Sequence, residues 1–127
     1  MRRIRSKDTR PELAVRKFLR ELGFSGYRLH RKELPGKPDV VYVGRRKAIF
    51  IHGCFWHGHG CKVGSRRPKS NSDYWLPKIE RNIQRDAAHG VALKKLGWQQ
   101  LIVWECELKE LEKLRPRITA FLEEEQR

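Results

Sequence analysis

Two hydrophobic periods run along this chain, and each predicts a different kind of element. Between Val15 and Leu22, apolar residues recur at the three- and four-residue spacing of one helix face, and Gly23 follows as a stop signal. Upstream, Thr9 can cap the helix while Glu12 reaches back to the Thr9 amide, the reciprocal pattern of a capping box. We therefore expect a first helix that begins just after Thr9 and ends at Gly23.

Short apolar and β-branched runs predict the strands of a sheet. They cover residues 27–30, 39–43, 47–52 and 98–103. The Leu-Pro-Gly-Lys-Pro segment at 34–38 is typical of a turn after the first run, and the Gly-Arg-Arg segment at 44–46 joins the second and third runs as a hairpin.

Two more helices complete the pattern. One is expected to start near Pro77, which suits a first helical turn, and to stop at Gly97. Its apolar side is traced by Ile79, Ile83, Ala87 and Val91. A last amphipathic helix carries leucines between residues 108 and 114, and Pro116 kinks or restarts it. The order αβββαβα predicts an α/β fold with a mixed central sheet flanked by helices, whose strand edges are available for a site.

Length and charge narrow the class of protein. With 127 residues, of which 39% are hydrophobic, we expect a single domain, residues 1–127, with a buried core. The chain carries 29 Lys and Arg against 15 Asp and Glu, a net charge of +14, and its pI is about 10.3. This balance is typical of a nucleic-acid-binding protein, although a basic structural protein of the ribosomal type has it too. No apolar run approaches the ~20 residues that span a bilayer, so no membrane partner is expected.

The number of cysteines and the character of the N-terminus indicate the cellular compartment. Three cysteines cannot pair completely as disulfides, and the charged N-terminus lacks the apolar segment of a secretory signal. Both features predict a reducing compartment in which thiols bind metal, and hence a cytoplasmic protein associated with the nucleoid.

The segment at 51–61, Ile-His-Gly-Cys-Phe-Trp-His-Gly-His-Gly-Cys, concentrates the side chains that bind zinc. Cys54, His59 and Cys61 supply three ligands within it. Cys106, at the end of the fourth expected strand, can complete a tetrahedral set of the structural kind.

Alternatives to this ligand set stay open. His57 or His52 can replace His59, which we prefer because the glycines on either side free its backbone and Cys61 is near. Cys106 can instead be a small buried side chain.

Two side chains near this segment suit metal-dependent cleavage of nucleic acid. Asp39 opens the second expected strand, where a nuclease carboxylate can bind Mg²⁺; a turn-forming Asp after Pro38 is the alternative. The next strand offers no carboxylate near Phe50, but the backbone carbonyl of Ile51 can serve as a ligand. His57 can take a proton from an attacking water, unless it is a surface residue or the fourth zinc ligand.

Further polar side chains are weaker candidates. Glu12 belongs either to the site or only to the helix cap. Asn82 and Asp86, four residues apart, share one helix face off the apolar stripe, which faces either the site or solvent.

Aromatic residues beside basic ones can wedge between base pairs. Phe55, Trp56 and Trp75 are the candidates, and core packing is the alternative. For Trp98 and Trp104 we expect core packing.

Several short motifs occur between residues 35 and 106 of this chain. They are Pro-Gly-Lys-Pro-Asp at 35–39, Phe-Ile-His-Gly-Cys-Phe-Trp-His-Gly-His-Gly-Cys at 50–61, Tyr-Trp-Leu-Pro-Lys-Ile at 74–79, Asn-Ile-Gln-Arg-Asp at 82–86, Leu-Gly-Trp at 96–98 and Val-Trp-Glu-Cys at 103–106. In these motifs the chain resembles the very-short-patch-repair mismatch endonucleases from its first residues to about Glu107. The resemblance implies a restriction-endonuclease-like αβββαβ core. It also implies an enzyme that nicks duplex DNA on the 5′ side of the thymine in a T·G mismatch left by deamination of 5-methylcytosine.

The resemblance further implies roles for single residues. Asp39 resembles the Mg²⁺-binding carboxylate, and Ile51, where some members have threonine, would bind Mg²⁺ through its carbonyl. His57 resembles the histidine that activates water. The implied supporting residues are Glu12, His52 and Asp86, with a His52–Asp86 hydrogen bond that orients the imidazole. The implied zinc ligands are Cys54, His59, Cys61 and Cys106. The implied intercalating residues are Phe55, Trp56, Trp75 and, in the place of a methionine wedge, Met1.

We therefore expect a Mg²⁺-dependent, strand-nicking endonuclease with one structural Zn²⁺. Its partner is double-stranded DNA with a T·G mismatch, and it acts as a monomer in cooperation with mismatch-repair proteins. The alternatives are a zinc-stabilised DNA-binding module without catalysis, and a generic nuclease with another specificity.

Overall fold

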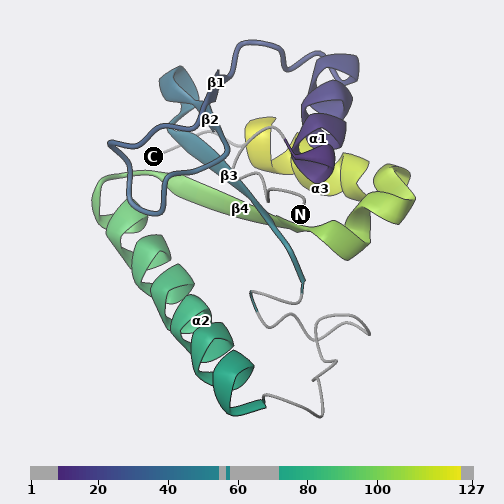
Figure 1. Ribbon diagram of the computed structural model, residues 1–127. Helices are drawn as coiled ribbons and strands as arrows, with labels where there is room; N and C mark the ends of the chain where they lie inside the picture. The colour runs from purple at the N-terminus through teal and green to yellow at the C-terminus, as the bar shows by residue number, and fades with distance from the viewer. Residues whose placement is uncertain (1–8, 55–56, 58–71, 124–127) are drawn as a thin grey trace.

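The chain follows the expected order of elements, αβββαβα (Figure 1). The computed structural model describes residues 9–54, 57 and 72–123. The helices are α1 (Arg10–Glu21), α2 (Ser72–Lys95) and α3 (Leu111–Glu123), and the strands are β1 (Arg28–Leu29), β2 (Val40–Tyr42), β3 (Lys47–His52) and β4 (Gln99–Trp104). Two short 3-10 helices, η1 (Val43–Arg45) and η2 (Glu105–Glu110), follow β2 and β4 within these described ranges.

The strands form one mixed sheet in the order β1-β2-β3-β4. The pairs β1–β2 and β2–β3 are antiparallel, whereas β3 and β4 are parallel, with His52 opposite Trp104. The expected hairpin joins β2 to β3 and closes at Arg46, whose φ of 53° is the left-handed conformation of tight turns. Because β3 and β4 are parallel, the segments that follow His52 and Trp104 leave the sheet at the same edge.

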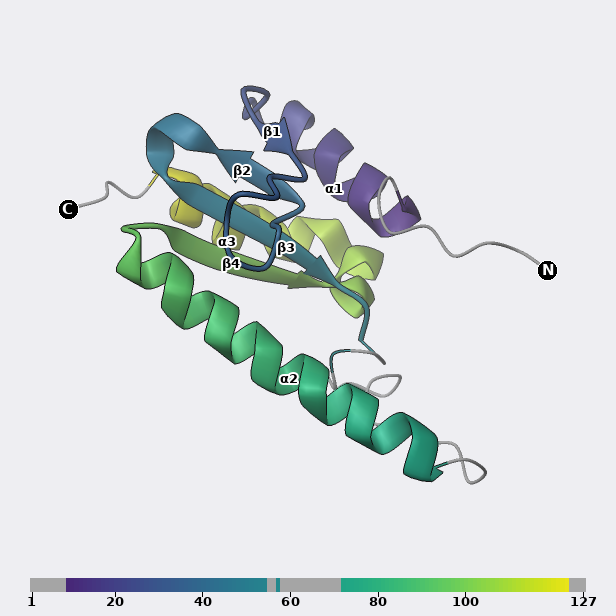
Figure 2. The same cartoon turned by 60° about the vertical axis from the view of Figure 1, so that its left-hand side comes forward.

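Helices cover both faces of this sheet, as Figure 2 shows. Helices α1 and α3 lie together on one face, where Leu19, Ile49 and Ile118 are fully buried in the main core. Helix α2 runs along the other face (Figure 2). No helix in the described part of the chain has the length and apolar character needed to cross a membrane.

The first helix begins where its cap was expected. The Thr9 Oγ1 accepts a hydrogen bond from the Glu12 amide at 3.4 Å, and Gly23 follows the helix with a φ of 92°. The reciprocal half of the capping box was predicted wrongly, because the Glu12 carboxylate instead contacts His30 at 2.7 Å. The Glu12 carboxylate, which could have completed the capping box, is instead buried against His30.

The prediction for α2 was wrong in its start and in its buried face. The helix begins at Ser72, so Pro77 lies inside it and not in its first turn. Ile79 is buried, but Ile83 and Val91 are 45% and 56% exposed. The side of the helix that faces the sheet carries polar residues that line a pocket, so it cannot be recognised from an apolar stripe.

The end of the chain also differs from the expected single helix. Residues Glu105–Glu110 form η2, and α3 then continues through Pro116. The Trp104 amide donates to the Glu107 carboxylate at 2.9 Å, and Arg117 donates both to Glu107 and to the carbonyl of Ile102, the latter at 2.8 Å. These contacts fix the turn after β4, which carries Cys106.

Candidate active site

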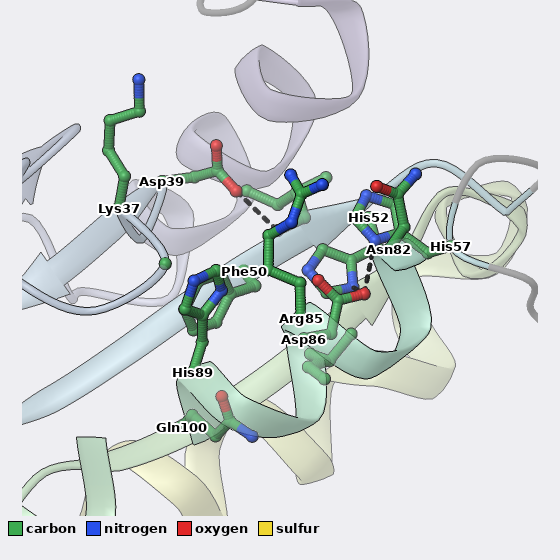
Figure 3. A pocket seen from close by; sticks show the side chains of 13 residues that line it. Lys37, Asp39, Phe50, His52, His57, Asn82, Arg85, Asp86, His89 and Gln100 are labelled. Carbon is green, nitrogen blue, oxygen red and sulfur yellow. Dashed lines mark hydrogen bonds and ion pairs between the residues drawn. The ribbon is translucent and has the colours of Figure 1, made fainter. Parts of the chain in front are cut away.

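A polar pocket of about 290 Å³ lies between the sheet and α2, and it brings the two principal candidates together (Figure 3). Asp39 reaches it from the position just before β2, and His57 from the segment after β3. Asn82 and Asp86 reach it from α2, so the helix face that they share points into the pocket and not into solvent. The fold thus brings Asp39 and Asp86, which are far apart in the sequence, to the same pocket.

Asp39 is held by the neighbouring strand. Its Oδ2 accepts a hydrogen bond from the Ile51 amide at 2.8 Å. Burial raises the pKa of Asp39 to about 6, the Ile51 hydrogen bond opposes this rise, and the nearby Glu12 carboxylate adds to it. A partly buried carboxylate that repels a second carboxylate fits a site for a divalent cation, since such a cation stabilises both charges.

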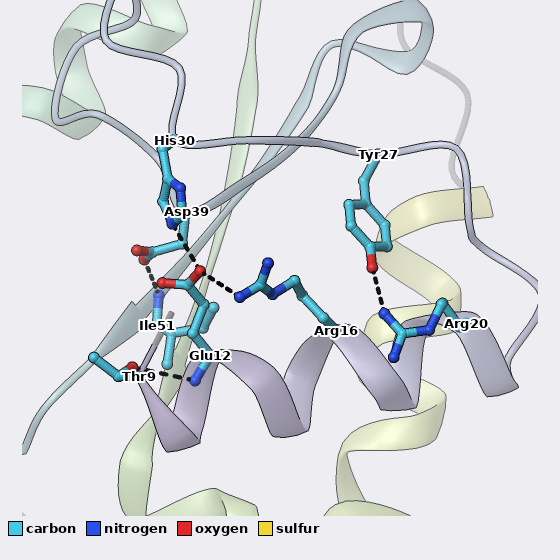
Figure 4. Close-up of polar contacts among 8 residues, drawn as sticks. All are labelled: Thr9, Glu12, Arg16, Arg20, Tyr27, His30, Asp39 and Ile51. Carbon is cyan, nitrogen blue, oxygen red and sulfur yellow. Dashed lines mark hydrogen bonds and ion pairs between the residues drawn. The ribbon is translucent and has the colours of Figure 1, made fainter. Parts of the chain in front are cut away.

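Glu12 forms the other half of this carboxylate pair (Figure 4). Its side chain is buried, and its Oε2 lies 2.7 Å from His30 Nε2 and 3.2 Å from Arg16. Ligand atoms of Glu12, His30 and Asp39 all lie within 4.8 Å of one another. Glu12 therefore lies at the site and is not only a helix cap. His30 was not predicted; no sequence pattern marks it. The i,i+4 spacing of Glu12 and Arg16 could have indicated their ion pair.

His57 and Asp86 form a close pair. The distance from His57 Nδ1 to Asp86 Oδ2 is 2.6 Å. Because a carboxylate accepts, the neutral ring carries its proton on Nδ1, and Nε2 keeps a lone pair. This is the tautomer in which an imidazole can accept a proton from water.

His52 does not make the hydrogen bond to Asp86 that was expected. Its Nδ1 lies 3.8 Å from Asp86 Oδ2, too far for a hydrogen bond. The ring instead stacks on His57, with centroids 3.8 Å apart and planes 6° apart, and meets Trp104 edge-on at 5.3 Å. Burial, followed by the charge of His57, lowers the pKa of His52 to about 4, so its ring is neutral at pH 7. His52 supports the His57 ring by packing.

Two of the expected zinc ligands lie next to each other. The Cys106 amide donates to Cys54 Sγ at 3.3 Å, and Cys54 is 4% exposed. A buried sulfur that accepts an amide hydrogen bond fits a metal-bound thiolate. His59 and Cys61 lie outside the described residues, so the rest of the ligand set stays a prediction.

The aromatic candidates are only partly described. Trp75 is half-buried near the start of α2 and meets the Tyr74 ring edge-on at 4.8 Å. Trp98 and Trp104 are half-buried too and lie outside the buried core cluster, contrary to expectation. The remaining intercalation candidates, Met1, Phe55 and Trp56, lie outside the described residues.

Two basic side chains line the pocket, and others continue along α2. Lys37 and Arg85 line it, and a second cavity beside α2 is lined by Lys78, Arg81, Asn82 and Arg85. Asn82 and Arg85 border both cavities. The spacing of residues 78, 81 and 85 on one helix face is a signal that sequence reasoning missed.

Known proteins match this chain over most of its length. The profile of the family described as DNA mismatch endonuclease Vsr matches residues 1–63. The type II nicking enzyme V.XorIIP of Xanthomonas oryzae is 52% identical over 97% of this chain and 89% of its own length. V.NmeAIP of Neisseria meningitidis, also a type II nicking enzyme, is 47% identical over 98% and 87%. The DNA mismatch endonuclease Vsr of Escherichia coli is 42% identical over 98% and 79%.

The site and these relatives together define the class of protein. A carboxylate pair, a histidine–aspartate pair and basic side chains around one pocket are the groups of a DNA endonuclease, a hydrolase acting on DNA. The chain belongs to the Vsr family of DNA mismatch endonucleases, which confirms the resemblance of its motifs.

Proposed function

We propose that this protein is a Mg²⁺-dependent endonuclease that nicks one strand of duplex DNA. The nick falls on the 5′ side of the thymine in a T·G mismatch that arises by deamination of 5-methylcytosine, and it initiates very short patch repair. The observation that carries the proposal is the single pocket into which both Asp39 and the His57–Asp86 pair project. The mixed sheet and the order αβββαβα support a restriction-endonuclease-like fold.

Each group of the pocket has a role in hydrolysis. Asp39 and the carbonyl of Ile51 would hold Mg²⁺, which supplies Lewis-acid stabilisation of the charge that develops on the phosphate. His57, with Nδ1 bound to Asp86, presents Nε2 to accept the proton of the attacking water. In-line attack leaves a 5′-phosphate and a 3′-hydroxyl. His52 maintains the orientation of the His57 ring by stacking on it.

Zinc has a structural role in this proposal. Cys54 and Cys106 would bind it together with His59 and Cys61, and their juxtaposition across β3 and β4 supports this assignment. A closed site of this type would fix the segment after β3 from which His57 projects. His57 itself is engaged by Asp86, which favours His59 as the fourth ligand.

DNA binding is assigned to the basic side chains and the aromatic wedge. Lys78, Arg81 and Arg85 follow one face of α2 towards the pocket and suit contacts with backbone phosphates. Trp75, near the start of α2, would stack at the mismatch together with Phe55, Trp56 and Met1. A T·G wobble pair is favoured because it is less costly to separate than a matched pair and displaces its base edges.

One assay tests the proposal and its alternatives. A T·G duplex and its matched duplex, each labelled on one strand, are incubated with Mg²⁺ and with wild type, Asp39→Ala or His57→Ala. We expect wild type to nick only the T·G duplex, 5′ of the thymine, and both variants to bind it without nicking. Binding without a nick by wild type would leave only a DNA-binding module, and equal cutting of both duplexes would indicate a generic nuclease.

A further inference from the structure

The Glu12 carboxylate is held from two sides at a single oxygen. His30 Nε2 lies 2.7 Å and Arg16 lies 3.2 Å from Oε2 of this buried side chain (Figure 4). Because both contacts use Oε2, neither needs the other oxygen, Oε1. Two contacts to one oxygen restrain the rotation of the carboxylate, and Oε1 is the oxygen that neither contact uses.

His30 links Glu12 to Asp39 through its side chain and its backbone. Its amide donates to the Asp39 carbonyl at 3.2 Å, while its ring binds Glu12. The backbone of His30 has a φ of 49°, a left-handed conformation that non-glycine residues rarely adopt. Such a conformation costs about 1 kcal/mol or more and persists where surrounding contacts hold it. One residue thus sets the separation of two carboxylates, one on α1 and one just before β2.

We propose that His30 is a positioning residue for the divalent cation bound at Asp39. The His30 Nε2–H group holds Glu12 so that its Oε1 faces that cation, directly or through a water. The ligand atoms of Glu12 and Asp39 lie within 4.8 Å of each other, a distance that one hydrated cation can bridge. This inference rests on the proposed Mg²⁺-dependent cleavage, and it adds a residue that no sequence pattern marks.

A second side-chain contact of α1 makes it possible to distinguish a positioning role of His30 from a purely structural one. Arg20, two turns further along α1, binds the Tyr27 hydroxyl at 2.7 Å and so ties α1 to the segment before β1, away from the carboxylates (Figure 4). Tyr27→Phe removes this tie and leaves the carboxylates untouched. If His30 only fastened α1 to the sheet, loss of either contact would have the same effect.

The experiment compares three variants with wild type. His30→Asn keeps a residue that tolerates the left-handed backbone but is too short to reach Glu12. His30→Gln places an amide N–H near the position of Nε2, and Tyr27→Phe is the matched control. Nicking of the T·G duplex is followed against Mg²⁺ concentration, and Mn²⁺ binding to the DNA-free protein is followed by electron paramagnetic resonance.

We expect His30→Asn to need at least about tenfold more Mg²⁺ for half-maximal nicking and to bind Mn²⁺ correspondingly more weakly, as is typical when a group supporting a metal ligand is lost. His30→Gln should regain most of this loss, and Tyr27→Phe should match wild type. The proposal is overturned if His30→Asn behaves as wild type, if Tyr27→Phe shows the same shift, or if His30→Gln restores nothing. Failure of the proposed function would look different: wild type itself would not nick, or Asp39→Ala would nick as well as wild type.

Discussion

Replacing Asp86 by asparagine tests whether His57 depends on its carboxylate partner. The two atoms, Nδ1 and Oδ2, are 2.6 Å apart, slightly shorter than the ~2.7–2.9 Å of typical charge-assisted N–H···O hydrogen bonds. An asparagine amide can present its N–H₂ group to Nδ1, which would move the ring proton to Nε2 and remove the base from the pocket. The side chain keeps its size, so packing is expected to change little.

The expected loss of nicking rate depends on the contacts that hold the His57 ring. In a serine-protease triad the equivalent change of Asp to Asn lowers the rate by about 10⁴ through the wrong tautomer. Here the ring is also held by stacking on His52 at 3.8 Å, so part of its orientation survives. We therefore expect the nicking rate of Asp86→Asn to fall by about 10²–10³, which is about 2.7–4 kcal/mol of activation free energy.

Single-turnover nicking of the T·G duplex at saturating Mg²⁺ and excess enzyme isolates the chemical step from binding and release. Glu80→Gln, which neutralises an exposed carboxylate on the same helix, controls for the change in net charge. DNA affinity and Tm should be unchanged in both variants. A rate for Asp86→Asn within about threefold of wild type would refute the assignment of His57 as a base tuned by Asp86.

Four changes test other parts of the site and fold. Lowering the pH below 6 should weaken Mg²⁺ activation, because the pKa of Asp39 is raised to about 6 and protons then compete with the cation; the half-maximal Mg²⁺ concentration should rise by up to about tenfold per pH unit. Cys54→Ala should remove zinc, measured by elemental analysis, and lower Tm. Gly36→Ala should reduce the free energy of unfolding in urea by at least about 1 kcal/mol, because Gly36 has a φ of 80° and an added Cβ would lie 3.0 Å from His89. Arg81→Ala should lower the slope of log affinity for DNA against log salt by about 0.9.

Each expectation has a contrary outcome. A half-maximal Mg²⁺ concentration that is constant between pH 5 and 7 would exclude Asp39 as a ligand with this pKa. Unchanged zinc content after Cys54→Ala would remove that ligand, and Gly36→Ala with wild-type stability would mean that the loop moves freely off α2. An unchanged salt slope for Arg81→Ala would show that this face of α2 does not contact phosphates.

Much of the fold was predictable because its signals are local. The cap at Thr9, the period of apolar residues in α1 and the hairpin between β2 and β3 depend on neighbours within a few positions. The rotation of α2 was not predictable. Its inner face is polar because it lines the pocket, and its exposed side carries Ile83 and Val91, so the usual rule for a surface helix fails here.

The sequence alone determined which chemical groups this protein possesses: an aspartate after a turn, histidines and cysteines in one short segment, and an excess of positive charge. Only the tertiary structure decided how they pair. In the folded protein Asp86 contacts His57 and is too far from His52 for a hydrogen bond, and Glu12 contacts His30. The physical reason is that a hydrogen bond depends on a few tenths of an ångström between residues distant in the chain, and those distances are set by the packing of the sheet and helices, not by local sequence preference.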